Sequence, residues 1–164
     1  MKILVVGGNF AGATAALELK RKLKDKVEVT LIDRNENFVY IPSLIWVPIK
    51  RREVSEIIIP RKQVLEKKGV KFVLDTAIKV EPDENKVYCE NGTYEYDHLI
   101  IATGPKVNFD IAPGIKENAC YIGTPPGAMH TREKLEEFKQ NPGSIVIGAT
   151  QNAGCMGAAY EFLF

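Results

Sequence analysis

The sequence predicts an α/β fold, with a parallel sheet, an antiparallel β-meander and the start of a second, similar strand-and-helix unit. Two observations predict this class. A strand, a glycine-containing turn and a helix follow one another in residues 1–19, and the same order returns in residues 144–164. Between them, three short strands within residues 77–96 are separated by turn residues, as in an antiparallel meander.

The first strand and turn carry the pattern of a dinucleotide-binding unit. Residues 3–6 are apolar and predict a buried strand, and the alanines and leucines of residues 13–19 predict a helix that runs to about Lys24. Glycines between them let the backbone come close to a pyrophosphate, whose charge the helix N-terminus and its dipole hold. The pattern predicts a Rossmann-like unit. The cofactor-binding residues expected in its turn are Gly7, Gly8, Asn9, Phe10, Ala11 and Gly12.

Two residues near this turn need separate interpretation. Asn9 stands where the nucleotide fingerprint has its second glycine. Asparagine tolerates a left-handed backbone, so the turn can form, but close approach to a pyrophosphate becomes harder. Asp33 ends the second predicted strand, Val27–Asp33, and lies 21 residues after Gly12. An acidic residue at this place accepts hydrogen bonds from ribose hydroxyls, and the alternative is a strand-end turn or capping residue.

The next strands complete the first unit. A short helix is expected to end at Lys68, and Val70–Leu74 is the following strand. Cys89 lies in the meander with ordinary strand neighbours and is expected to be structural. Residues 98–102 form an apolar strand of the kind found in the middle of a parallel sheet. The strand ends at small residues that let the backbone approach a cofactor, namely Ala102, Thr103 and Gly104.

Residues 34–53 are aromatic and apolar, and they follow neither a helical nor a strand period because Pro42 and Pro48 interrupt them. They either cover the protein's own core or form a wall of a pocket for a flat apolar part of a ligand, and the residues alone favour neither.

The last third of the chain alternates loops with regular elements. The sequence predicts a loop at 106–123, a turn at 124–127, a helix at 128–139, a strand at 144–148 and a helix from about Cys155. The expected domains are residues 1–105, a connecting part at 106–143, and a truncated strand-and-helix unit at 144–164. Because the last helix has no closing residues, we expect this chain to be the front part of a longer protein.

Composition excludes several function classes. The formal net charge of +1 gives no field that favours nucleic acid. Three scattered cysteines and two histidines form neither a disulfide scaffold nor a metal-ligand pattern, so no metal is expected. No apolar run reaches the ~18–20 residues that span a bilayer, and the first residues enter a strand without a signal-peptide pattern. A cytoplasmic protein is therefore expected.

The order of glycine turn, Asp33, Ala102-Thr103-Gly104 and second turn resembles the pyridine nucleotide-disulfide reductase superfamily of flavoproteins. Within it, the chain is most similar to the sulfide:quinone oxidoreductases, with flavocytochrome c sulfide dehydrogenase near by. The most specific stretches are residues 141–149 and residues 154–162, which include Cys155 and Glu161. The resemblance covers nearly all of the chain but only the front part of the family's length.

The resemblance implies an enzyme that binds FAD through its first unit and passes two electrons from sulfide, through a redox cysteine and the flavin, to quinone. It implies Cys155, Cys120 and Glu161 as catalytic residues. A cysteine at a helix start, as predicted for Cys155, has a lowered pKa, which is an independent reason for that role. The further cofactor-binding residues that it implies are Asp33, Arg34, Pro42, Ala77, Ile78, Ala102, Thr103 and Gly104.

The resemblance also implies partners and alternatives. The full-length family members are expected to form homo-oligomers and to associate peripherally with the inner face of the cell membrane. The turn of residues 148–154 has glycine only at its two ends, which disfavours a nicotinamide site and a type II NADH:quinone dehydrogenase, the main enzymatic alternative. Residues 38–48 lack the cysteine pair of disulfide reductases, which excludes that activity. A non-catalytic FAD- or nucleotide-binding domain or subunit is the alternative of another class.

Overall fold

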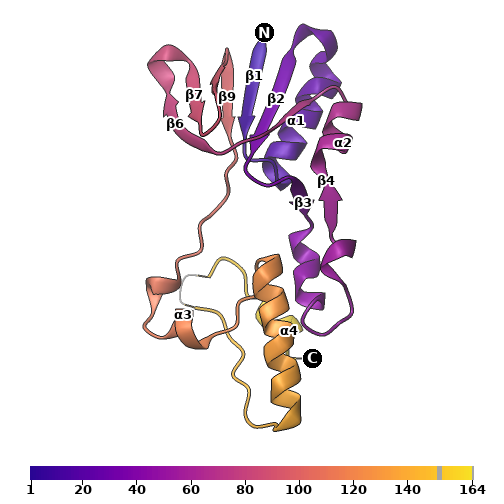
Figure 1. The fold of residues 1–164 in the computed structure, drawn as a ribbon, viewed down its shortest axis with the longest axis vertical. Coiled ribbons are helices and arrows are strands. Elements are labelled where there is room, and N and C mark those ends of the chain that lie inside the picture. The colour runs from indigo at the N-terminus through magenta and orange to yellow at the C-terminus, as the bar shows by residue number, and fades with distance from the viewer. Residues whose placement is uncertain (151–152, 164) are drawn as a thin grey trace. The chain divides into compact units, whose positions relative to one another are not determined.

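The computed structural model describes residues 1–150 and 153–163, and the chain forms two compact units (Figure 1). The first unit comprises Met1–Val39 and Ile59–Pro105. The second comprises Tyr40–Ile58 and the described residues from Lys106 onward. Residues 40–58, which the sequence assigns to the first domain, thus cluster with the second unit. The predicted three-part division of the chain stays a prediction.

The first unit is built on a four-stranded parallel sheet with the order β5-β2-β1-β9. The strands are β1 (Lys2–Val6), β2 (Glu28–Asp33), β5 (Lys71–Leu74) and β9 (His98–Ile101), connected in part by α1 (Phe10–Leu23) and α2 (Arg61–Lys67). Ile3 pairs with Val29 on one side and with His98 on the other. The predicted parallel sheet is confirmed.

One detail of the sheet differs from the prediction. β9, expected in the middle of the sheet, is an edge strand because it pairs with β1 alone among the strands of the described chain. Its apolar character therefore does not lead to burial, and Ile101 is 62% exposed.

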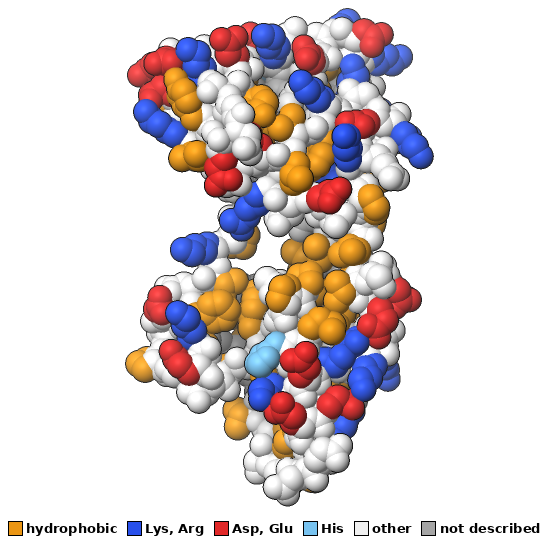
Figure 2. Space-filling model, in the orientation of Figure 1, with side chains coloured by type: hydrophobic (Ala, Val, Ile, Leu, Met, Phe, Trp, Pro, Cys, Tyr) orange, Lys and Arg blue, Asp and Glu red, His pale blue; other side chains and the backbone are white. Residues whose placement is uncertain are grey.

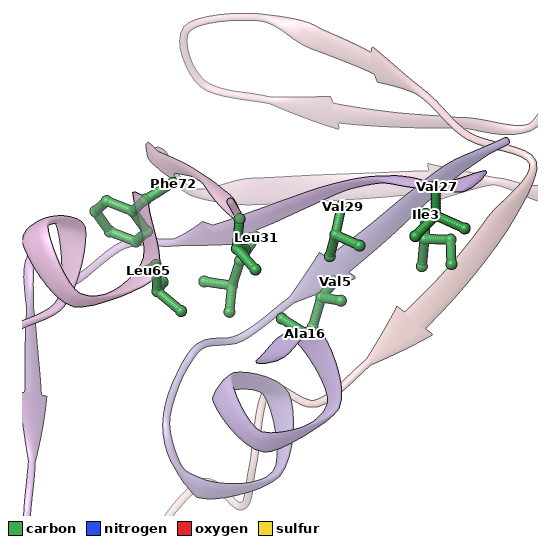
Figure 3. Packing of buried hydrophobic residues seen from close by; sticks show 9 residues of the cluster. Ile3, Val5, Ala16, Val27, Val29, Leu31, Leu65 and Phe72 are labelled. Atoms are coloured by element: carbon green, nitrogen blue, oxygen red, sulfur yellow. The ribbon is translucent and has the colours of Figure 1, made fainter. Parts of the chain in front are cut away.

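Alternation along β1 builds a core on each face of the sheet. Ile3 and Val5 face α1 and α2, and a cluster forms there that also includes Leu31 and Ala16, both with 0% exposure (Figure 3). Leu4 and Val6 point to the opposite face. Each fully buried aliphatic side chain contributes about 1.5–3 kcal/mol to folding.

The second face of the sheet is covered by the predicted meander. It consists of the antiparallel strands β6 (Ala77–Glu81), β7 (Lys86–Cys89) and β8 (Thr93–Glu95). The short helix η4 (Pro82–Glu84) and left-handed Asn85, with a φ of 53°, turn the chain from β6 to β7. Val87 and Cys89 of β7 pack against Leu4, Val6 and Ile32 of the sheet. Two short strands, β3 (Asn37–Val39) and β4 (Ile58–Pro60), form a separate two-stranded sheet.

The second unit is organised around α4 (Pro125–Gln140). This helix starts earlier than predicted, because the residues expected to form a turn are its first turn. Thr124 is the N-cap, and its hydroxyl accepts the N–H of Gly127 at 3.2 Å. Pro125 and Pro126 occupy the first two helical positions, where no N–H is needed. The unit also contains the short helices η2 (Ile41–Trp46), η3 (Val54–Glu56), η5 (Phe109–Ile111), α3 (Ile115–Asn118) and α5 (Gly157–Glu161).

Arg132 of α4 holds the segment 40–58 in place. Its guanidinium donates to the carbonyl oxygens of Val47 at 2.7 Å and Arg52 at 2.8 Å, and it pairs with Glu53 at 2.8 Å. Leu44 and Val47 of this segment are buried, with 1% and 0% exposure. These side chains therefore belong to the core of the second unit, as one of the two interpretations of this stretch expects.

The strand predicted at residues 144–148 is not formed. Val146 in its middle is 96% exposed, and no strand of the described residues runs beside it. A strand needs a hydrogen-bonded neighbour, so an apolar run alone does not produce one. The following helix, α5, begins at Gly157 rather than at Cys155. The residues of the predicted second turn at 151 and 152 lie outside the described residues.

Candidate functional site

The turn after β1 depends on two glycines. Gly7 has a φ of +94°, and a Cβ built on it would lie 2.3 Å from the carbonyl oxygen of Ala102. A Cβ on Gly12 would lie 1.7 Å from the carbonyl oxygen of Gly7. Real Cβ atoms do not come this close to other heavy atoms, so both positions require glycine. The turn therefore lies directly against the end of β9 and allows α1 to start beside it.

Asn9 is the N-cap residue of α1, with a φ of −86°. The position does not need the left-handed backbone for which asparagine or glycine is suited. Its carbonyl oxygen accepts the N–H of Ala13 at 2.9 Å, while its side chain makes no capping bond. The side-chain oxygen Oδ1 is buried and has no hydrogen-bond partner among the described residues. An orphaned acceptor at this place suits an ordered water or a hydroxyl group of a ligand.

The start of α1 is suited to an anion. The first turn contains no acidic side chain, and basic residues stand in the last turn, at Lys20, Arg21 and Lys22. The first N–H groups of a helix have no intrahelical acceptor, and the helix dipole adds positive potential there. A pyrophosphate fits this arrangement of donors without a basic side chain.

Asp33 lies at the end of β2, and its carboxylate is fixed by three donors. Oδ2 accepts the N–H of Gly8 at 2.5 Å, and Oδ1 accepts the N–H of Asn35 at 2.7 Å. Arg61 Nη1 lies 3.2 Å from Oδ1, and the Asp33 side chain is 11% exposed. The carboxylate is thus joined to the glycine turn by a direct hydrogen bond, next to the predicted anion site.

Ala102, Thr103 and Gly104 follow β9 at the same edge of the sheet. The N–H of Ala102 donates to the carbonyl oxygen of Val6 at 2.7 Å, which extends the pairing with β1 by one bond. Gly104 has a φ of +74°, and a Cβ on it would meet no heavy atom within 4 Å. The structure therefore brings the glycine turn, Asp33 and residues 102–104 together at the carboxyl ends of β1, β2 and β9, where parallel sheets bind ligands.

Arg61 is a residue of this site that the sequence analysis missed. It is the first residue of α2, is 4% exposed, and contacts Asp33. A cation at a helix N-terminus opposes the helix dipole, so an arginine there needs another reason. A basic residue at the start of a predicted helix could therefore have indicated that it pairs with a buried acidic group.

The other predicted cofactor-binding residues have varied surroundings. Arg34 is exposed on the loop after β2, and Ile78 is 67% exposed on β6. Ala77 packs in the core between the meander and the sheet. Pro42 is exposed in η2 and belongs to the second unit. Their predicted contacts with a cofactor stay predictions.

The predicted catalytic residues belong to the second unit. Cys120 and Cys155 are exposed free thiols, and Glu161 is exposed at the end of α5. The N–H of Gly157 donates to Sγ of Cys155 at 3.4 Å. The predicted redox roles stay predictions.

Cys89 differs from these two thiols because it is buried. Burial, together with the charge of Asp75, raises the pKa of Cys89 to about 11. Asp75 itself is 5% exposed, and burial opposes its ionisation. The N–H groups of Thr76 and Asn91, the Asn91 side chain and the Tyr94 hydroxyl outweigh this effect, so the pKa of Asp75 lies below its ordinary value. Asp75 joins the end of β5 to the meander.

Residues 1–150 and 153–163 contain neither a metal-site cluster nor a membrane-spanning helix. No cluster of three or more His, Cys, Asp and Glu side chains has the arrangement of a metal site. No helix within the same ranges combines the length and the apolar content needed to cross a bilayer. On the face shown in Figure 2, acidic and basic side chains are intermixed on both units, as the small net charge leads one to expect.

Comparisons with known proteins agree with this geometry. Residues 1–156 match the family model of pyridine nucleotide-disulphide oxidoreductases. A sulfide-quinone reductase of Aquifex aeolicus (strain VF5) is 37% identical over 161 residues, which are 98% of this chain and 37% of that relative. A type II NADH:quinone oxidoreductase of Staphylococcus aureus (strain NCTC 8325 / PS 47) is 29% identical over 99% of this chain and 42% of its own length.

A solved structure gives a similar result. The crystal structure of the sulfide:quinone oxidoreductase from the hyperthermophilic bacterium Aquifex aeolicus matches 99% of this chain with a TM-score of 0.93 and 36% identity. The match covers 38% of that protein. The chain therefore spans less than half the length of the relatives that it matches.

Proposed function

The chain belongs to the pyridine nucleotide-disulphide oxidoreductase family, and we propose that it is the FAD-binding part of a sulfide:quinone oxidoreductase. One observation carries the cofactor assignment. The glycine turn, Asp33 and residues 102–104 converge at one edge of the sheet, which gives donors for a pyrophosphate and an acceptor for a ribose. Similarity to sulfide-quinone reductases over 98% of the chain supports the choice of substrate.

The residues present fit the ADP half of FAD. The N–H groups at the start of α1 bind the pyrophosphate, and Gly7 and Gly12 let the turn pack against the end of β9 so that α1 starts there. Asp33 accepts a ribose hydroxyl, and Gly104 offers backbone with open space where its Cβ would stand. The bound flavin supplies a two-electron acceptor. Pro42, Ala77, Ile78 and Arg34 are proposed as further contacts.

Cys155 is proposed to receive sulfide as the redox cysteine, together with Cys120. Its exposure lets a small anionic substrate reach the sulfur, which accepts the N–H of Gly157 at 3.4 Å. Glu161 is proposed to handle protons. It lies at the end of α5, whereas Cys155 precedes that helix, so direct coupling between the two through one helix is not part of the proposal.

Quinone is proposed as the electron acceptor. Because quinones of respiratory chains are lipid-soluble, the proposal includes a protein that lies peripherally on the cytoplasmic face of the cell membrane. Homo-oligomer formation by the whole protein is part of the same proposal.

A second candidate function is a type II NADH:quinone oxidoreductase, which the 29% identity to the Staphylococcus aureus enzyme favours. The glycine-poor turn at residues 148–154 disfavours it, because a nicotinamide dinucleotide needs close backbone approach there. The two functions differ in their electron donor, which is sulfide in the first and NADH in the second.

The experiment has two stages. The 164-residue chain is purified and its visible spectrum recorded with and without added FAD, and we expect flavin absorption; a chain that stays colourless overturns the cofactor assignment. In the protein that contains this chain, quinone reduction is then measured with sulfide and with NADH. We expect activity with sulfide, its loss in Cys155→Ser, and its retention in Cys89→Ala, the matched buried cysteine. Activity with NADH alone supports the second candidate, and full sulfide activity in Cys155→Ser refutes the redox role.

A further inference from the structure

Arg61 is a buried arginine whose hydrogen bonds and ion pair involve Asp33 and the loop after it. Its side chain is 4% exposed. Nη1 donates to the carbonyl oxygen of Asn35 at 2.5 Å and lies 3.2 Å from Asp33 Oδ1, while Nη2 donates to the carbonyl oxygen of Asn37 at 2.9 Å. The guanidinium also lies over the ring of Phe72, 5.6 Å from its centre. Arginine is rarely buried to this extent without a specific arrangement of acceptors.

The stem of the Arg61 side chain lies against the glycine turn. A Cβ on Gly8 would lie 3.1 Å from Nε and 3.2 Å from Cδ of Arg61, and 2.6 Å from Cδ2 of Leu31. Gly8 in turn donates its N–H to Oδ2 of Asp33. The turn, the carboxylate and the guanidinium therefore contact one another in a closed triangle.

The same side chain carries an energetic disadvantage. Its Nε is buried without a hydrogen-bond partner among the described residues. A buried ion pair of this kind adds little net stability compared with apolar side chains of the same volume. A buried arginine with one unsatisfied donor is therefore better explained by what its two Nη groups position than by stability.

The effect of the arrangement is to orient Asp33. Each carboxylate oxygen has two lone pairs. Oδ1 receives Asn35 and Arg61, whereas Oδ2 receives one donor, Gly8, among the hydrogen bonds of the described chain. The second acceptor position of Oδ2 stays available to a hydroxyl group.

We propose that Arg61 is a positioning residue of the nucleotide site, which fixes Asp33 so that Oδ2 accepts a hydroxyl of the adenosine ribose. The inference rests on the proposed FAD site and adds a residue to it. Arg61 touches no cofactor atom in this proposal. It acts by holding the carboxylate and the carbonyl groups of the loop 35–37 in one arrangement.

The test compares ADP with 2′-deoxy-ADP by titration calorimetry on the 164-residue chain. Because ADP can donate one more hydrogen bond to the charged acceptor, we expect the wild-type chain to bind ADP about 10-fold more tightly than 2′-deoxy-ADP, and this affinity ratio is the quantity compared below. In Arg61→Met we expect this ratio to fall towards about 1, because the Asp33 carboxylate loses the guanidinium and is held only by the N–H groups of Gly8 and Asn35, so Oδ2 is less well oriented towards the ribose hydroxyl. Arg61→Lys keeps the charge, but an ammonium group cannot contact Asp33, Asn35 and Asn37 together as the planar guanidinium does. We therefore expect an affinity ratio between those of the wild type and Arg61→Met.

The matched control is Arg132→Met. Arg132 is the other arginine described above with a largely buried side chain, 12% exposed, and it bonds Val47, Arg52 and Glu53 in the second unit. We expect Arg132→Met to lower the stability of the chain but to keep the wild-type ratio of the affinities for ADP and 2′-deoxy-ADP. Thermal unfolding is measured for every variant.

Each outcome has one meaning. A wild-type ratio in folded Arg61→Met overturns the inference and leaves the FAD site standing. If Arg61→Met does not fold, a wild-type ratio in Arg61→Lys overturns it, and an intermediate ratio supports it. A wild-type chain that binds neither nucleotide refutes the proposed site, and the role of Arg61 with it.

Discussion

Gly12→Ala tests how the glycine turn is built. The position lies near the start of α1, where alanine is a better helix former than glycine by about 1 kcal/mol. On helix propensity alone, the substitution is expected to stabilise the chain. The structure predicts the opposite, because the new Cβ would lie 1.7 Å from the carbonyl oxygen of Gly7 and 3.3 Å from Cβ of Ala102.

The magnitude follows from these two opposing effects. Adding a methyl group to a packed site costs about 1–3 kcal/mol. The clash here is with a backbone carbonyl, which cannot rotate away as a side chain can, so we expect the upper end, about 3 kcal/mol. After subtracting about 1 kcal/mol of helix propensity, the net loss is about 2 kcal/mol. For a chain of this size, that lowers Tm by about 4–8 °C.

The assay is thermal unfolding followed by circular dichroism, together with ADP titration. Gly143→Ala is the control, because a Cβ at Gly143 would meet no heavy atom within 4 Å. We expect its Tm to stay within about 2 °C of wild type. We expect weaker ADP binding for Gly12→Ala only. Equal Tm and equal ADP affinity in the two variants would refute the account of the turn.

Three further predictions concern buried polar groups and thiols. Asn9→Gly should keep or raise the Tm, because no capping bond is lost and the unsatisfied Oδ1 disappears; a clear drop in Tm would show that the side chain has a partner. Since the pKa of Asp75 is lowered in the folded state, its contribution to stability is present above the unfolded pKa of about 3.9 and is lost as pH falls through the folded value. Asp75→Asn should therefore unfold more easily at pH 7 and show a weaker pH dependence below pH 4 in acid titrations followed by circular dichroism, and a wild-type titration curve contradicts this. Iodoacetamide should label Cys120 and Cys155 of the native chain at pH 8 but not Cys89, which is measured by the mass of the intact chain. Rapid labelling of all three cysteines would contradict the burial of Cys89.

The first unit was predictable because its signals are local and agree with one another. Residues 3–6 are apolar, the glycines follow at once, and Asp33 closes the next strand, so strand, turn and acidic residue could be placed before the structure was known. The meander followed from turn residues at regular spacing. The predicted strands agree with β2 and β5 to within one residue, whereas α1 begins at Phe10, three residues before the predicted start at Ala13.

Other features depend on contacts that no local pattern encodes. Arg61 is 28 residues from Asp33 in sequence, and only the packing of α2 beside β2 brings them together. The strand predicted at 144–148 has the right residues but no neighbouring strand within residues 1–150 and 153–163. The turn predicted at 124–127 contains two prolines, which fit a helix start as well as a turn, and the Thr124 cap decides between them.

The contacts of Arg132 with residues 47–53 determine how the chain can be shortened without loss of solubility. Residues 40–58 lie in sequence between two parts of the first unit, yet their buried side chains and the ion pair of Lys50 with Glu136, at 2.9 Å, tie them to α4. A shortened chain that stops at Pro105 would keep this segment and lose the helix that covers Leu44 and Val47. Such a chain would expose apolar surface and aggregate, although its parallel sheet would be complete. A soluble fragment of the first unit would instead need residues 40–58 replaced by a short polar connection.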